Sequence, residues 1–125
     1  MKRLLFFICT LLCANVLWAQ YEYPGGIGYV ITSTNPPQVE VYDANLSITT
    51  ANIPTTVTYQ GITYSVTAIA QRAFICCYDL TSVTIPNSVI SIGGGAFASC
   101  RSLTSVTIPN SVTSIENGTF NWCES

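Results

Sequence analysis

The stretch LTSVTIPNSVISIGGGAFASCRS at Leu80–Ser102 is followed directly by LTSVTIPNSVTSIENGTFNWCES at Leu103–Ser125. The two 23-residue segments are identical at 16 positions, and most of the shared residues that carry large side chains are apolar. These apolar positions are Leu80, Val83, Ile85, Val89, Ile92, Phe97 and Cys100, matched by Leu103, Val106, Ile108, Val112, Ile115, Phe120 and Cys123. A repeat of this length is typical of solenoid proteins, in which each repeat forms one coil.

A third copy of the repeat lies upstream and is longer than the other two. Stepping back 23 residues from the apolar positions of Leu80–Ser102 gives Val66, Ile69, Ala73, Phe74 and Cys77. An Ile53-Pro54 pair corresponds to Ile85-Pro86, but the segment between this pair and Val66 contains nine additional residues, Val57–Ser65. Apolar and polar residues alternate on both sides of Gln60-Gly61 in this insertion, which predicts a β-hairpin.

The residue types within a repeat favour strands over helix. Hydroxyl and β-branched residues alternate in Ser82–Ile85, and Pro86-Asn87-Ser88 then predicts a turn. Val89–Ile92 reads as a second short strand, Gly93–Gly95 permits a sharp bend, and Ala96-Phe97 is expected to begin a helical or 3₁₀ turn. One coil buries too little apolar surface to fold alone, so stability is expected to come from stacking.

These residues also carry a family resemblance. The pattern L-x-x-V-x-I-P-x-x-V-x-x-I-x-x-x-[AT]-F-x-x-C-x-x, which covers about Ile53–Ser125, resembles the 23-residue leucine-rich repeat of BspA-like bacterial surface antigens. The resemblance and the repeat together predict an all-β fold. We expect a short right-handed leucine-rich-repeat β-solenoid with an N-terminal β cap and an open C-terminal edge.

The predicted organisation has five parts, in chain order. They are a signal peptide at 1–19, an N-terminal β cap at 20–48, a first modified repeat with the hairpin insertion at 49–79, and repeats at 80–102 and 103–125. Because the last repeat would leave an unpaired strand edge and an apolar core edge, the chain is expected to be a fragment of a longer array.

The first 19 residues have the pattern of a bacterial secretory signal. Lys2-Arg3 form a positive segment, Leu4–Leu12 an apolar segment too short for a membrane span, and Val16–Ala19 a cleavage site. Cleavage leaves six acids and two arginines, a net charge of −4. A chain with two cations cannot neutralise a row of phosphates, so nucleic acid is excluded as a partner. We expect a secreted or cell-surface protein with no transmembrane span after cleavage.

Four cysteines remain after cleavage, and three interpretations are open for them: a zinc site, a disulfide, or buried free thiols. Cys77, Cys100 and Cys123 recur at the repeat period and should form a ladder with steps of about 4.8 Å. One pair at that spacing could form a disulfide, whereas zinc needs converging ligands. Buried free thiols are the preferred interpretation, with Cys76 the most exposed.

The hydroxyl residues of the repeat strands are the candidate binding site. Ser82 and Thr84 should stack beside Ser105 and Thr107 on one face of a sheet, although such residues also simply suit a solvent-facing strand. Tyr59 and Tyr64 of the hairpin, together with Tyr78 and Trp122, are candidates outside that face because aromatic residues are common in binding hot spots. Arg101 and Glu124 occupy equivalent positions and are expected to pair across the stack.

The sequence does not predict an enzyme. It contains no histidine, and no acid lies in the hydroxyl-bearing strands, so no catalytic residue, cofactor or metal ligand is assigned. The family resemblance implies an exported module that binds extracellular or cell-surface proteins, with adhesion as its role. The alternative is a truncated structural repeat module with no binding activity of its own.

Overall fold

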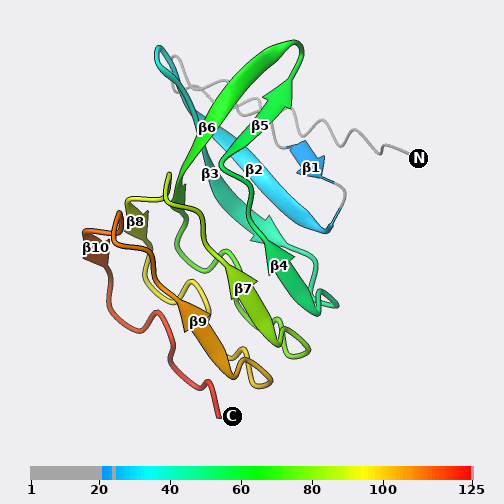
Figure 1. Cartoon of the computed structure of the whole chain (residues 1–125). Coiled ribbons are helices and arrows are strands. Elements are labelled where there is room, and N and C mark those ends of the chain that lie inside the picture. The colour runs from blue at the N-terminus through cyan, green and yellow to red at the C-terminus, as the bar shows by residue number, and fades with distance from the viewer. Residues whose placement is uncertain (1–20, 24, 125) are drawn as a thin grey trace, which may run out of the picture.

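The computed structural model describes residues 21–23 and 25–124, which form ten β-strands and no helix. The predicted signal segment at 1–19 lies outside these residues. The described part of the chain therefore includes no helix able to cross a membrane. The molecule is a β-solenoid of about three turns with a β-sheet extension at its N-terminal end (Figure 1).

The first three strands form an antiparallel meander. Strand β1 (Tyr21–Tyr23) pairs with β2 (Ile27–Thr34), which in turn pairs with β3 (Pro37–Ala44). Gly26, with φ of 77°, lies in the turn before β2, and its carbonyl accepts a 2.7 Å hydrogen bond from the Asn45 N–H just after β3. The meander covers the N-terminal end of the core.

The nine-residue insertion forms a hairpin between β5 (Thr56–Tyr59) and β6 (Ile62–Ile69). Gln60 and Gly61 both have positive φ, as a two-residue hairpin turn requires. Beyond the hairpin, the second half of β6 pairs with β3 on one side and with a coil strand on the other. Strand β6 thus belongs to both the cap and the solenoid.

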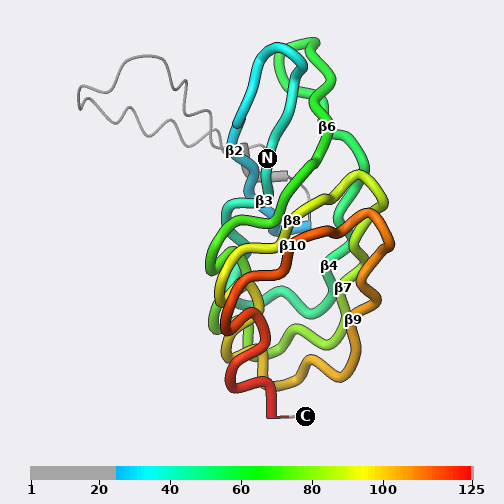
Figure 2. The backbone as a smooth tube through the Cα atoms, turned by 90° about the vertical axis from the view of Figure 1, so that its left-hand side faces the viewer, coloured from blue at the N-terminus to red at the C-terminus, as the bar shows by residue number. Residues whose placement is uncertain are grey.

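Each coil contributes one short strand to each of two parallel stacks. One stack is β4-β7-β9, and the other continues the cap sheet as β6-β8-β10. The bounds are β4 Thr50–Asn52, β7 Ser82–Thr84, β8 Ser91–Ile92, β9 Ser105–Thr107 and β10 Ser114–Ile115. Figure 2 shows the successive coils lying one above another. Val83 pairs with Val106, which lies one 23-residue repeat later in the chain. Ala51 pairs with Val83 across a longer sequence separation, because the hairpin insertion lies between them.

The segment that begins at Ala96-Phe97 was expected to form a helical or 3₁₀ turn, and the structure has no helix there. Instead, three separate backbone bonds close successive tight turns: Ala96 N–H to the Gly93 carbonyl, Ala98 to Gly95, and Cys100 to Phe97. Gly95 and Ser99 have φ values of 64° and 62°. These left-handed residues interrupt the run of helical dihedrals that a continuous helix needs.

A stack of phenylalanine rings runs through the core along the solenoid axis. The Phe74 and Phe97 ring centroids lie 5.1 Å apart with planes 13° apart, and those of Phe97 and Phe120 lie 5.5 Å apart with planes 5° apart. Phe74 and Phe97 are fully buried, whereas 39% of Phe120 is exposed. Ring pairs at such distances add to the energy of burial, so the middle ring gains from two neighbours.

The cysteines form a second ladder beside the rings. All four described cysteines are free thiols, as preferred from the sequence, and Cys77 and Cys100 are buried. The Cys100 thiol donates to the Phe74 carbonyl at 3.1 Å, and the Cys123 thiol donates to the Phe97 carbonyl at 3.2 Å. Each thiol therefore hydrogen-bonds to the backbone of the preceding coil while its sulfur fills the core.

We expect Phe97→Ala to lower the free energy of unfolding by about 3–5 kcal/mol, because it leaves a cavity between two rings. Phe120→Ala should cost less, since the Phe120 ring is partly exposed and stacks on one neighbour. Denaturant titration of the two variants measures the difference. A loss below about 1 kcal/mol at Phe97, or equal losses at both positions, would contradict this account of the core.

The buried thiols should also make the fold sensitive to alkaline pH. Burial raises the pKa of Cys77 to about 11 and that of Cys100 to about 12, from an ordinary value of 9.0. The folded chain therefore keeps these thiols neutral at pH values where the unfolded chain ionises them. Their contribution to stability is complete below pH 9 and is lost as the pH rises toward these folded-state values.

The matched variant is Cys100→Ser, which retains a donor for the Phe74 carbonyl but has no thiol to ionise. The fall in unfolding free energy between pH values below 9 and about 11 should be smaller in this variant than in the unsubstituted chain. If both proteins lose the same stability over that interval, ionisation of Cys100 has no part in the alkaline response.

Candidate binding surface

The four predicted hydroxyl residues lie together on the face of the β4-β7-β9 sheet. Ser82 is directly opposite Ser105, and Thr84 is directly opposite Thr107. All four are exposed, while Val83 between them is buried. The alternation of the strands thus sends valine to the core and hydroxyls to solvent, as the sequence predicted.

The ladder extends to a third strand that the sequence reasoning missed. Thr50 of β4 is opposite Ser82, and Asn52 is opposite Thr84. Both side chains are exposed. The hairpin insertion hid them by breaking the 23-residue spacing, and the available signal was the position of these polar residues just before Ile53-Pro54. We call the six residues Thr50, Asn52, Ser82, Thr84, Ser105 and Thr107 the polar ladder.

An open hollow of about 410 Å³ lies where β7 and β9 end. Its lining residues come from two adjacent coils and are Val83, Thr84, Ile85, Asn87, Thr107, Ile108, Pro109 and Asn110. The polar members are two hydroxyls and two amides, each of which can both donate and accept hydrogen bonds. The hollow carries no charged group, and its volume is in the range of ligand pockets.

The hydroxyls of the ladder are not used to hold the fold together. Within the described residues, none of Ser82, Thr84, Ser105 and Thr107 has a hydrogen-bond partner for its side chain. Other hydroxyls are engaged: Thr81 donates to the Thr49 carbonyl at 2.9 Å, and Ser111 to the Val89 carbonyl at 2.7 Å. The ladder groups therefore remain available to an external partner.

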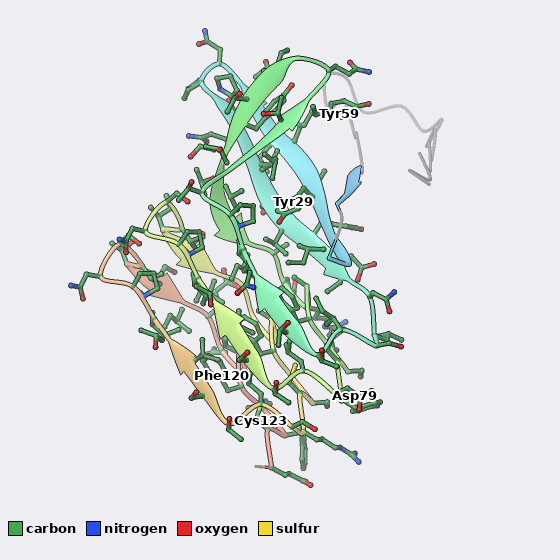
Figure 3. All side chains as sticks on the ribbon, turned by 45° about the vertical axis from the view of Figure 1, so that its right-hand side comes forward. Tyr29, Tyr59, Asp79, Phe120 and Cys123 are labelled. Carbon is green, nitrogen blue, oxygen red and sulfur yellow. The ribbon has the colours of Figure 1, made fainter. Side chains whose placement is uncertain are left out.

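The two tyrosines proposed from the hairpin do not join this surface. Tyr64 is 4% exposed and packs in the core, so its side chain is not presented on the surface. Its ring faces inward because it lies opposite Val57 on the buried face of the hairpin. Tyr59 is half-buried, and its phenol oxygen accepts a 3.2 Å hydrogen bond from Gln60. Figure 3 shows Tyr59 on the hairpin, at the other end of the molecule from Phe120 and Cys123.

The chemistry of the ladder suits hydrogen bonding and not proton transfer. Its strands carry no acid or base, and hydroxyl nucleophiles need an adjacent base to become reactive. Among residues 21–23 and 25–124, no three histidine, cysteine or acidic side chains are grouped so that they could hold a metal ion. What the surface offers is an exposed, uncharged array of donors and acceptors in fixed register.

Several solved structures of bacterial proteins are similar to this chain. A leucine-rich repeat protein from Bacteroides ovatus is 36% identical with a TM-score of 0.74, over 81% of this chain and 27% of that chain. A leucine rich cell surface protein from Faecalibacterium prausnitzii is 32% identical with a TM-score of 0.68, and the match covers 83% of this chain and 28% of that chain. A leucine-rich repeat protein from Bacteroides capillosus is 31% identical with a TM-score of 0.65, over 76% and 86%.

This chain thus spans about a quarter of the length of the first two of these proteins. A search among curated proteins gave no match. The family model for the BspA type leucine rich repeat region matches residues 42–125, which include all three coils. The predicted resemblance is confirmed, and the chain belongs to the family of BspA-type leucine-rich repeat proteins.

Proposed function

We propose that this protein is an exported module that binds extracellular or cell-surface proteins, with adhesion as its role, and that the polar ladder is its contact surface. The observation that carries the proposal is the availability of the ladder hydroxyls. They are exposed and in register, and their side chains have no partner within the described part of the chain. Solenoids commonly bind partners along such an extended face.

Two further observations support a location at the cell surface or outside the cell. Met1–Ala19 has the charge and hydropathy pattern of a signal peptide. The Faecalibacterium prausnitzii relative is described as a cell surface protein. The low number of cations argues against nucleic acid as the partner, so the proposal is restricted to proteins.

A second candidate function is a structural repeat module that binds nothing on its own. It is favoured by the composition of the ladder, which lacks the Trp, Tyr and Arg residues common in binding hot spots. Under this alternative, the hydroxyls serve only to make a strand surface soluble. The two functions predict different outcomes in one binding experiment.

The experiment compares the chain with a variant in which Ser82, Thr84, Ser105 and Thr107 are all changed to Lys. Both proteins are immobilised and exposed to a panel of extracellular-matrix proteins. We expect the affinity of the variant to be at least about tenfold lower. Four ammonium groups would replace uncharged hydrogen-bonding groups, and binding of the partner would remove these charges from water.

The control carries the same change in charge on the hairpins. Thr34, Thr56, Gln60 and Thr63 are exposed and lie outside the ladder, so their replacement by Lys should leave binding within about twofold. Equal binding by the ladder variant and the unsubstituted chain would exclude the ladder as the contact. Absence of binding by every protein would favour the structural module.

A further inference from the structure

The two near-identical coils differ almost entirely in one part of the repeat. Of the seven positions that differ between 80–102 and 103–125, six fall within 93–101 and 116–124. We call these tight turns, with 70–78 of the first coil, the turn edge. The polar ladder shows the opposite behaviour, since Ser82 and Thr84 recur unchanged in the next coil. Different side chains are therefore presented on the turn edge by each coil.

The backbone beneath this variation is constant. The Cys76 N–H donates to the Ala98 carbonyl at 2.9 Å, and the Ser99 N–H donates to the Asn121 carbonyl at 2.8 Å. Cys76, Ser99 and Trp122 occupy equivalent positions and have left-handed φ values of 60°, 62° and 62°. A fixed scaffold thus places unlike side chains in known relation to one another, which is a favourable arrangement for specific recognition.

Arg101 occupies a distinct environment on this edge. Its guanidinium carbon lies 5.3 Å from the centroid of the Tyr78 ring, a cation–π contact. The ion pair expected with Glu124 is not formed, and within the described residues no hydrogen bond or salt bridge engages Arg101. Because the contact with the ring uses none of the guanidinium N–H groups in a hydrogen bond, these groups can bind a carboxylate through two parallel hydrogen bonds.

The backbone at Tyr78 lies in a tight turn, in which the Tyr78 N–H donates to the Cys76 carbonyl at 2.8 Å. Interaction with the Cys76 side chain is also the largest reason that the pKa of Tyr78 lies above its ordinary value. The tyrosine side chain is nevertheless 49% exposed, so part of the ring remains accessible. The contact between Arg101 and the Tyr78 ring is therefore partly open to solvent.

Exposed apolar side chains lie on the same turn edge as Arg101 and Tyr78. Trp122, which is 71% exposed, lies one coil beyond Ser99, and Ser99 is two residues before Arg101 in the same turn. Ile75 is also an exposed large apolar side chain of this edge. Trp, Tyr and Arg are the residues most enriched in binding hot spots. Of these two surfaces, the turn edge therefore carries hot-spot residue types and the polar ladder does not.

We propose that the turn edge around Tyr78, Arg101 and Trp122 is a second recognition surface, and that its partner is a protein segment with one carboxylate beside an aromatic or aliphatic side chain. The carboxylate would pair with the Arg101 guanidinium, and the apolar side chain would pack against the exposed Trp122 ring. Outside the signal segment the chain has six acids and two arginines. That balance disfavours anionic membranes and other arrays of negative charge, but it permits a single ion pair.

The test is an NMR titration of the full chain that follows the Arg101 Nε–Hε signal. The probes are acetyl-Phe-Asp-Leu-amide and its uncharged match, acetyl-Phe-Asn-Leu-amide. We expect the first peptide to shift the signal and to bind with a Kd near about 1 mM, and the second to bind at least about tenfold more weakly. No shift at about 10 mM of the Asp peptide, or equal binding of both peptides, overturns the proposal.

Matched variants separate recognition from general charge. Arg101→Gln should weaken binding of the Asp peptide by about tenfold, whereas Arg72→Gln, the same charge change on the same edge, should alter it by less than about twofold. Tyr78→Ala, which removes the ring that contacts Arg101, should also weaken binding of the Asp peptide. Equal losses at Arg101 and Arg72, or binding to vesicles of anionic phospholipid in place of the peptide, would overturn the assignment.

This surface is independent of the proposed ladder contact. The variant with Lys at Ser82, Thr84, Ser105 and Thr107 should bind the Asp peptide as the unsubstituted chain does, within about twofold. Loss of peptide binding in that folded variant would show that the two surfaces are not separate, and would overturn a distinct site on the turn edge.

Discussion

The hydrogen bonds that each coil makes to the one before it hold this structure together, because the short strands of the two regular coils have no partners within their own coil. Parallel pairing joins β4 to β7 to β9, and the turns are bonded from coil to coil in the same way. The phenylalanine stack and the thiol bonds to the Phe74 and Phe97 carbonyls repeat this pattern in the core. Stability is thus a property of adjacent coils and not of any one of them.

The same requirement divides the surface into two kinds. Strand positions are tightly restricted, since alternate residues must fill the core and keep the register, and the polar ladder recurs with them from coil to coil. The tight turns need only a few small or left-handed residues and a buried phenylalanine, so their outward side chains can differ, as Ser99 and Trp122 do. Constant hydroxyl and amide groups and variable outward side chains are consequently presented on separate parts of one scaffold.

The sequence was sufficient to predict the coils, because a 23-residue recurrence of large apolar residues has few other structural explanations. It also located Ser82, Thr84, Ser105 and Thr107 on one exposed face. It missed Thr50 and Asn52, whose spacing is changed by the hairpin, and it did not indicate that Tyr64 faces the core. Alternation shows that neighbouring residues point in opposite directions, but it does not show which direction is inward. The Arg101 contact with Tyr78 depends on side-chain geometry between coils, which periodicity alone does not determine.

Each residue of β7 pairs with the residue 23 positions later in β9. This regular pairing affects how the sequence of such a protein can evolve. An in-frame genetic duplication of one coil adds a unit whose strands already match those of its neighbour, so the longer chain inherits a folded core without further substitution. The new turn then carries a spare copy of each outward side chain. Substitution there, of the kind that separates Ser99 from Trp122, alters what the molecule presents to its surroundings while the inherited core is retained.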